Sequence, residues 1–238
     1  MNRGKTLNWN LNPDVNILGG ANGSGKSRLL ETIQMSIIGL SDYIRSYVCD
    51  SVELYITDTE TGLTNLYNPD DKDNYISDIS LKDNIDMPLE DIKDYIYGLW
   101  RNNKPENHKM LSVEAMNNIL IDKRVNLSNS DELRFVIKDY KDSPIIPSYR
   151  LTIGEQRLIW MVLNAVNARI KGVPTVMLLD IPEYGLHIDY QRILLRYLNR
   201  LCPDNMQIIC ATHAPSMIDG YRDKVYEINQ ILKNEDNQ

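Results

Sequence analysis

The sequence predicts an α/β fold in which strands alternate with helices. An apolar run at 14–18 ends at glycines, and apolar residues at helical spacing follow over 26–40. The alternation returns near the end, with helices expected at 154–171 and 188–201 and strands at 174–180 and 206–212. The 238 residues are 42% hydrophobic and 25% charged, which is ordinary for a globular protein.

The middle third of the sequence does not follow the alternation of strands and helices. We expect it to form an inserted β-hairpin and helical lobe over 41–150, within a single domain spanning 1–238. Two alternating runs flank TETG within 52–67, which predicts a hairpin. The stretch 68–80 is rich in Asp and Asn and is typical of a solvated loop. Further along, we expect mainly helix over 81–126, with a break near RNNKPENH, and then a strand at 133–140.

The end of the chain is expected to add a short helix after Pro215, a strand near 224–228 and a frayed tail, KNEDNQ. Trp9 precedes the glycine-rich segment. It is expected to be a half-buried strand residue, with stacking on a base as the alternative.

Composition and charge exclude several classes of protein. The net charge of −7 argues against a generally basic protein that coats nucleic acid. The three cysteines are far apart and form no CxxC pair, which indicates reduced, mostly buried thiols. The polar start lacks the apolar core of a signal peptide, and no run of about 18 apolar residues could span a membrane. We therefore expect a cytoplasmic protein without a membrane partner.

Residues 20–27, GANGSGKS, match the phosphate-loop pattern G-x-x-x-x-G-K-S/T. Glycines allow backbone amides to turn toward phosphates, where a Cβ would block the approach. Lys26 is expected to reach the β- and γ-phosphates, and the Ser27 hydroxyl to bind Mg²⁺. A glycine turn that only caps a helix is the alternative, but the full pattern between strand and helix favours nucleotide binding. The predicted nucleotide-binding residues here are Asn22, Gly23, Ser24, Gly25, Lys26 and Ser27.

A second group of motifs follows residue 150. The apolar strand PTVMLLD ends in Asp180, which gives a carboxylate the rigid support that a magnesium ligand needs. LTIGEQ at 151–156 precedes this strand, and His213 follows the strand MQIICAT.

The order GxNGSGKS, LTIGEQ, LLDxPExGLH and ATHAP resembles the ATP-binding-cassette superfamily of ATPases. The variant LLDIPEYGLHID with ATHAPSMI is most similar to the RecF-like and overcoming-lysogenization-defect ATPases, which include DNA-repair heads and anti-phage ATPase subunits. The resemblance covers 14–40 and 150–230 and implies a P-loop NTPase core with ATP and Mg²⁺ as cofactors.

The resemblance implies that LTIGEQ is a signature closing on the ATP held by a second subunit, through Thr152, Gly154, Glu155 and Gln156. A hydroxyl, a close backbone amide and a helix N-terminus would meet the γ-phosphate there. A side chain at Gly154 is then expected to block the dimer without affecting the monomer. The alternative, which is compatible with the first, is a capping box between Thr152 and Glu155.

The resemblance also implies that Gly185, Leu186 and His187 form a loop crossing the dimer interface, and that His213 senses the γ-phosphate. Two positions depart from the family pattern. Ile181 stands where the water-activating Glu is usual, so Glu183 becomes the nearest candidate base, and no Gln lies between Gln34 and Gln156 to form the glutamine loop. Both departures indicate binding with slow or absent hydrolysis.

We therefore expect an ATP-sandwiched homodimer that controls a separate effector such as a nuclease, with nucleic acid reached through that partner, in DNA repair or anti-phage defence. The chain ends soon after His213, where related nucleases continue into a nuclease domain. The nucleotide-binding subunit of a membrane transporter is the alternative, although PEYGLH replaces the transporter-like D-E-P-T/S-x-x-L-D. A kinase would explain the phosphate loop but neither LTIGEQ nor His213.

Overall fold

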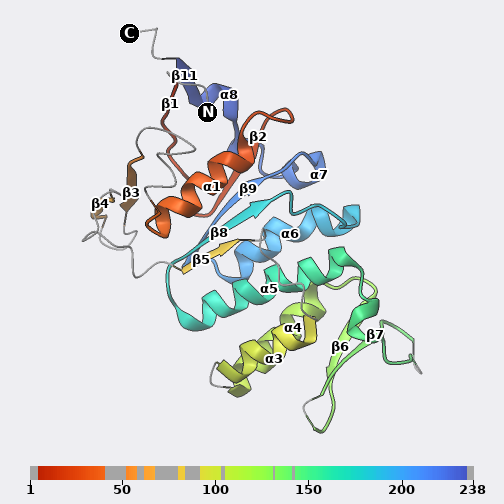
Figure 1. The fold of residues 1–238 in the computed structure, drawn as a ribbon. Helices are drawn as coiled ribbons and strands as arrows, with labels where there is room; N and C mark the ends of the chain where they lie inside the picture. Colours follow the sequence, from red (N-terminus) through yellow and green to blue (C-terminus); the bar gives the residue numbers. More distant parts are fainter. Residues whose placement is uncertain are drawn as a thin grey trace.

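The computed structural model describes residues 5–40, 52–57, 62–67, 80–83, 92–102, 105–130, 132–140 and 143–234. A five-stranded sheet lies at the centre, in the order β10-β2-β9-β8-β5, and all its pairings are parallel (Figure 1). These strands are β2 Val15–Gly19, β5 Ser80–Asp83, β8 Thr175–Asp180, β9 Met206–Ala211 and β10 Val225–Glu227. The predicted α/β class is therefore confirmed.

Helices cover both faces of the sheet, which explains why the central strands read as continuous apolar runs. On one face lies α1 Lys26–Ile37, where Leu29 and Leu30 pack against Leu18 and Leu178. The larger core on the other face is closed by α5 Ile153–Lys171 and α6 Ile188–Leu201. Two further helices, α3 Ile92–Asn102 and α4 Pro105–Ile119, pack on α5 (Figure 1).

The segment between α1 and α5 forms two β-hairpins in addition to β5, α3 and α4. A first hairpin, β3 Leu54–Thr57 with β4 Thr64–Tyr67, packs through Leu54 against the α1 side of the core. A second hairpin, β6 Lys123–Leu127 with β7 Leu133–Ile137, adjoins α4.

The expectation of mainly helix over 81–126 is wrong at both ends, while α3 and α4 between them are helical. At the start, β5 joins the central sheet beside β8, a distant pairing that overrides local propensity. At the end, β6 alternates between exposed and buried residues around Val125, as a strand does, rather than continuing the helix. The loop expected at 68–80 lies outside the described residues except for Ser80.

The last elements follow the expected order. They are α7 Pro215–Ile218, the 3₁₀ turn Arg222–Lys224, β10 and α8 Ile228–Ile231. The sequence did not predict that β1 Lys5–Leu7 and β11 Leu232–Asn234 form an antiparallel pair, which ties the two ends of the chain together. Part of the tail expected to fray is therefore a strand.

Cys202 and Cys210 are buried free thiols, as expected, and burial raises the pKa of each. Cys49 lies outside the described residues. Among the helices of the described chain, none is both long and apolar enough to cross a membrane.

Candidate functional site

The candidate site lies at the edge of the sheet where the parallel strands β2, β8 and β9 reach their carboxyl ends, the usual ligand edge of such sheets. The glycine-rich loop follows β2, and Asp180 ends β8 opposite Ala211 of β9. Since Leu18 of β2 is also opposite Ala211, the pairing brings the loop, Asp180 and the segment leading to His213 together.

The loop between β2 and α1 adopts backbone conformations that require glycine. Gly20, Gly23 and Gly25 have φ values of 138°, 75° and 102°, and Gly25 is the N-cap of α1. A Cβ at Gly20 would lie 2.8 Å from the Ser24 Oγ. That Oγ is buried and has no hydrogen-bond partner within the described part of the chain. A strand, a left-handed glycine turn and a helix N-terminus are the parts of a phosphate cradle.

Lys26 opens α1 and is only 6% exposed. Its ammonium donates hydrogen bonds to the Gly20 and Ala21 carbonyls, at 2.8 and 3.0 Å, and so lies folded against the loop. Burial lowers the pKa of Lys26, and the nearby carboxylates of Asp180, Glu227 and Glu183 oppose that shift. The loop thus holds a desolvated cation where the carboxylates of three segments converge.

Sequence reasoning missed Glu227. This residue ends the edge strand β10 and is paired with Gly19, immediately before the loop. A Cβ at Gly19 would come within 2.6 Å of the Glu227 Oε1. Only the strand order could have revealed this carboxylate, because β10 follows β2 by about two hundred residues.

Ile181, directly after Asp180, has a φ of 46°. A β-branched residue in the left-handed region is a strained outlier, and such outliers cluster at functional sites. Its amide donates to the Ala211 carbonyl at 2.9 Å, and its side chain is 39% exposed. The backbone is therefore held in a special conformation at the position where the resemblance to ATP-binding-cassette ATPases implies a water-activating Glu.

The structure brings Glu183 and His213 together through the backbone. Glu183 Oε1 accepts a hydrogen bond from the His213 amide at 2.9 Å. Its Oε2 is buried and lacks a hydrogen-bond partner among the described residues. The His213 side chain is exposed. One oxygen of Glu183 thus fixes the segment after β9, and the other lies buried without a hydrogen-bond partner in the described ranges.

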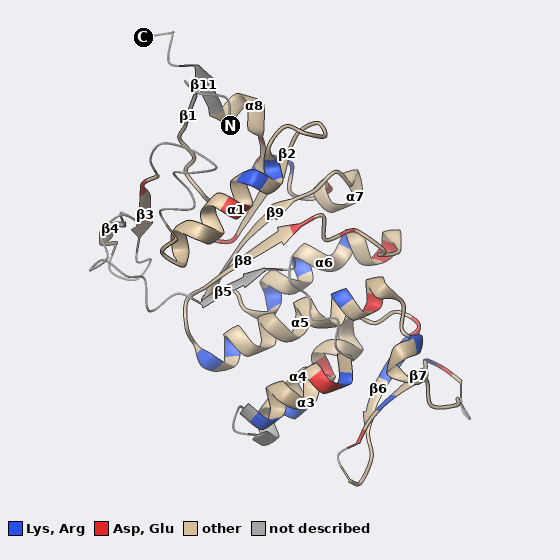
Figure 2. Ribbon diagram, in the orientation of Figure 1, with Lys and Arg blue, Asp and Glu red and all other residues tan. Residues whose placement is uncertain are grey.

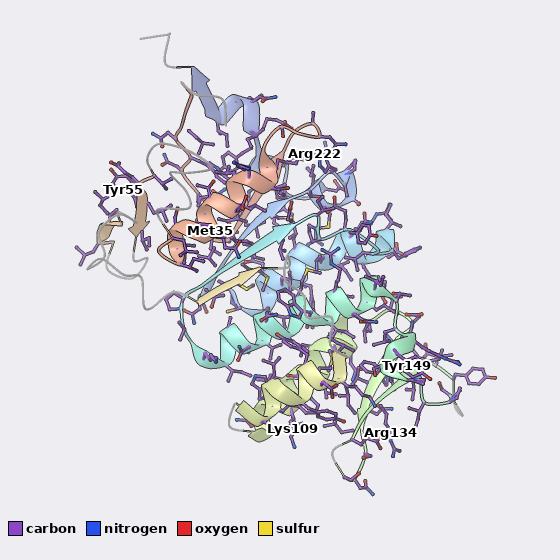
Figure 3. The ribbon with its side chains drawn as sticks, viewed as in Figure 1. Met35, Tyr55, Lys109, Arg134, Tyr149 and Arg222 are labelled. Carbon is purple, nitrogen blue, oxygen red and sulfur yellow. The ribbon has the colours of Figure 1, made fainter. Side chains whose placement is uncertain are left out.

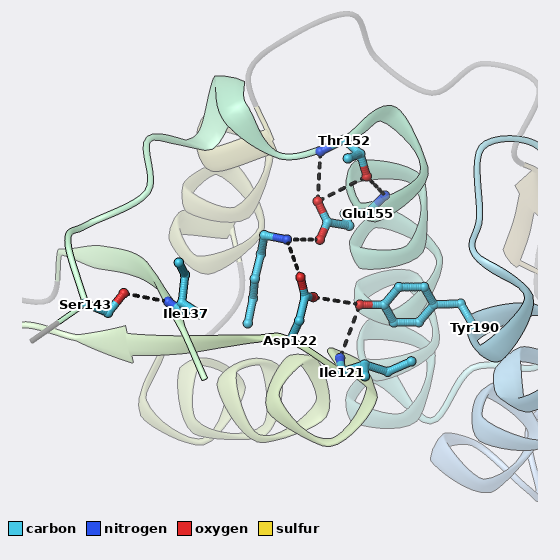
Figure 4. A network of polar contacts seen from close by, with 8 residues as sticks. Ile121, Asp122, Ile137, Ser143, Thr152, Glu155 and Tyr190 are labelled. Carbon is cyan, nitrogen blue, oxygen red and sulfur yellow. Dashed lines mark hydrogen bonds and ion pairs between the residues drawn. The ribbon is translucent and has the colours of Figure 1, made fainter. Parts of the chain in front are cut away.

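The capping box proposed as an alternative for the signature is present. Thr152 Oγ1 accepts from the Glu155 amide at 3.2 Å, and Glu155 Oε2 accepts from the Thr152 amide at 2.8 Å. The other oxygen, Glu155 Oε1, accepts from the Lys123 ammonium, which also binds Asp122 (Figure 4). Burial alone would lower the pKa of Lys123, but its bonds to Glu155 and Asp122 raise it above the ordinary value.

This polar network extends beyond the signature helix. Asp122 Oδ1 accepts from the Tyr190 hydroxyl of α6 at 3.4 Å, and the Ile121 amide donates to the same hydroxyl at 3.1 Å (Figure 4). The start of the β6–β7 hairpin is thereby joined to both α5 and α6. Sequence analysis gave no sign of Lys123, because its partner Glu155 is 32 residues away.

The remaining residues of the predicted signature LTIGEQ contact other parts of the same chain. A Cβ at Gly154 would lie 1.9 Å from the Gly185 carbonyl oxygen, so α5 and the 183–187 loop pack backbone against backbone. The expectation that a side chain at Gly154 leaves the monomer intact is therefore wrong. Gln156 Nε2 donates to the Leu151 carbonyl at 3.0 Å.

Two flanking residues complete the description of the site. Arg157, which the sequence analysis also missed, donates to the Tyr184 carbonyl at 3.4 Å and lies 5.6 Å from the Tyr184 ring centroid. Trp9 lies outside any strand. It is half-buried, with its ring edge-on to Tyr226 at a centroid distance of 5.3 Å.

Comparison with known proteins identifies the family. Residues 68–218 match the family described as AAA ATPase domain, a range that begins after the phosphate loop. No curated protein sequence matches this chain. The fold is similar to an Smc head bound to the C-winged helix domain of ScpA, with a TM-score of 0.54 and 17% identity over 87% of this chain and 84% of that chain. An SMC head domain from Thermotoga maritima is similar with a TM-score of 0.55 and 16% sequence identity, over 88% of this chain and 84% of that chain.

At such identities the structural similarity establishes the fold alone, which is that of the SMC head domains. The family match spans more than half of the chain and includes LTIGEQ at 151–156, Asp180 and His213. The chain therefore belongs to the AAA ATPase domain family.

Proposed function

We propose that this chain is a cytoplasmic ATP-binding switch of the RecF-like, overcoming-lysogenization-defect type. Two copies pair head-to-tail around two ATP molecules with Mg²⁺, hydrolyse them slowly or not at all, and control a separate effector. The effector is a protein that acts on nucleic acid, such as a nuclease, in DNA repair or anti-phage defence. Among similar folds, the Smc head bound to a domain of ScpA is a precedent for a head with a protein partner.

The observation that carries this proposal is Ile181. Its strained backbone, with a φ of 46°, keeps a special geometry beside Asp180, yet its aliphatic side chain cannot accept a proton. General-base assistance contributes about 10²–10⁴-fold in enzymes that use it. Without it, ATP acts mainly as a ligand that holds two heads together. Besides Asp180, which we assign to Mg²⁺, Glu183 is the nearest carboxylate in the sequence, and one of its oxygens already holds the His213 amide.

The residues of the phosphate loop fit ATP with Mg²⁺. The glycine conformations and the unpartnered Ser24 Oγ suit a phosphate cradle, and the buried Lys26 ammonium supplies the cation. Ser27 and Asp180 would hold Mg²⁺, which neutralises phosphate charge when bound. His213 would report on the γ-phosphate, with the hydrogen bond between its amide and Glu183 fixing the segment that carries it.

The exposed surface around the signature supports a contact in trans. Thr152 is exposed at the N-terminus of α5, while Gly154, Glu155 and Gln156 serve to position that end. Ile153 is 61% exposed, and Tyr149, which Figure 3 labels beside β6 and β7, is 73% exposed. We place the protein contact at these exposed apolar side chains.

Light scattering with and without ATP and Mg²⁺ tests the proposal. We expect ATP to convert monomer to dimer, and Ile153→Asp to prevent this by placing a desolvated charge in the contact. Ile153→Asp leaves the packing of Gly154 against Gly185 in place, and the variant should still bind ATP. Ile170→Asp, an exposed position at the opposite end of the same helix, is the matched control. The same oligomer with and without ATP, or an equal effect of both variants, would rule out the sandwich.

A further inference from the structure

A row of arginines lies along the exposed face of α6. Arg192, Arg196 and Arg200 are four residues apart, so they follow one another at steps of about 6 Å on one side of the helix. All three side chains are exposed. Figure 2 shows the basic segments recurring along α6, away from the phosphate loop at the start of α1.

The packing of α6 fixes the direction of this row. The buried residues of the helix are Tyr190, Leu194, Leu195 and Leu198, which face the core. The arginines lie on the opposite side, where the apolar residues that remain partly exposed, Ile188 and Ile193, are at the margins. The surface therefore has cationic side chains at its centre rather than an apolar anchor.

The middle of this row lies close to the segment that follows α7. Arg196 lies over Gly220, whose added Cβ would be 3.3 Å from the guanidinium. Burial raises the pKa of Tyr221, and Asp14, the ion-pair partner of Lys224, adds to that shift. Arg196 and Arg200 oppose it, so both arginines lie near the Tyr221 ring.

At the other end of the row, Arg200 and Arg169 of α5 line a hollow of about 180 Å³, together with Cys202, Pro203, Asp204 and Asn205. We call Arg192, Arg196, Arg200 and Arg169 the arginine row.

The four arginines of the arginine row form weak ion pairs or none within the described part of the chain. Arg192 is 3.7 Å from Asp189, and both side chains are more than half exposed, so this pair contributes at most about 1 kcal/mol. Arg196, Arg200 and Arg169 form no ion pair with any described residue. The row is thus available to an external anion, in a protein whose net charge of −7 does not itself attract anions.

The chemistry of the row favours a nucleic-acid strand over an acidic protein. Guanidinium groups bind phosphate through paired hydrogen bonds, and one helical turn is comparable with the step between successive phosphates of a strand. Protein interfaces usually have an aromatic or apolar centre, whereas the exposed side chains of the row are guanidinium groups and the nearby Tyr221 is only partly exposed. We infer that the arginine row binds the phosphate backbone of a nucleic-acid strand, without reading its sequence and apart from the ATP site. This goes beyond the proposed function, in which nucleic acid is reached through the effector.

Fluorescence anisotropy with labelled single-stranded and duplex DNA, between about 50 and 200 mM salt, tests this inference. The variant R192Q/R196Q/R200Q removes three charges from exposed helical positions. Each lost phosphate contact lowers the salt slope by about 0.7 on single strands and 0.9 on duplex, so we expect a decrease of about 2 to 3 and affinity lower by more than about tenfold at low salt.

The matched control is R124Q/R134Q/K138Q, which removes the same charge from the β6–β7 hairpin and should leave DNA binding nearly unchanged. R192K/R196K/R200K should keep the salt slope and lose part of the affinity. The ATP affinity measured by titration should be the same for every variant. A failure of the DNA-binding inference is therefore distinguishable from a failure of the proposed ATP switch. The inference is overturned if the wild-type protein does not bind DNA at low salt or if the control variant loses binding equally. It is also overturned if polyglutamate displaces DNA as well as unlabelled DNA does.

Discussion

The ion pair between Lys123 and Glu155 joins the β6–β7 hairpin to the N-terminus of the signature helix (Figure 4). Lys123→Met removes the charge and keeps the length of the side chain. The side chains of Lys123 and Glu155 are 14% and 6% exposed, so the variant leaves a buried carboxylate without its cation. We predict that the protein is destabilised, while its affinity for ATP is unchanged.

The magnitude follows from the remaining contacts. Removing one partner of a buried ion pair costs about 3–5 kcal/mol. Glu155 keeps the hydrogen bonds from the Thr152 amide and hydroxyl, which places the expected loss at the lower end, about 3 kcal/mol. For a chain of this length, each 1 kcal/mol shifts the melting temperature by about 2–4 °C. Lys123→Met should therefore lower the melting temperature by about 6–12 °C.

Thermal and urea unfolding measure this loss, with Lys138→Met on the same hairpin as a control that should stay within about 0.5 kcal/mol. The double variant Lys123→Met/Glu155→Gln should recover part of the loss, because the orphaned charge is gone. The pKa of Lys123 is raised in the folded state, so its stabilisation is fully present below the unfolded pKa of about 10.5 and is lost as pH rises through the folded pKa. Equal stability of Lys123→Met and wild type at neutral pH would refute the role given to this pair.

Two further predictions concern the glycine and lysine positions of the site. Lys26→Ala should weaken ATP binding by about 1.5–3 kcal/mol, or roughly 10- to 150-fold, in an equilibrium titration, and unchanged affinity would contradict the phosphate-loop assignment. Gly154→Ala should lower the free energy of unfolding by about 1–3 kcal/mol, because its Cβ would lie 1.9 Å from the Gly185 carbonyl oxygen. Gly98→Ala, where a Cβ meets nothing within 4 Å, should instead be neutral or stabilising in urea unfolding.

Local pattern was sufficient to predict the parts of the site that depend on neighbouring residues. The strand, glycine turn and helix around GANGSGKS form as expected, and the strand PTVMLLD ends at Asp180. The capping box follows from Thr152 and Glu155 three residues apart. Helix α6 spans the expected range because its apolar residues recur at helical spacing.

What the sequence could not predict depends on pairing between distant segments. Glu227 reaches the loop only because β10 lies beside β2, and β5 is a strand because it pairs with β8. Lys123 meets Glu155 only once the second hairpin has folded against α5. The contact of Gly154 with Gly185 is likewise tertiary, so the sequence motif alone suggested a free surface there.

In the function we propose, ATP is held rather than turned over because position 181 lacks a base. The most direct test is the steady-state rate of ATP hydrolysis by wild type and Ile181→Glu, with Ile181→Gln as a polar control that cannot act as a base. We predict a wild-type rate below the ordinary range of about 1–10³ per second. Ile181→Glu should raise this rate by about 10²-fold or more, and Ile181→Gln should leave it unchanged. A wild-type rate within the ordinary range that is insensitive to both Ile181→Glu and Glu183→Gln would contradict the account, because another residue would then activate the water.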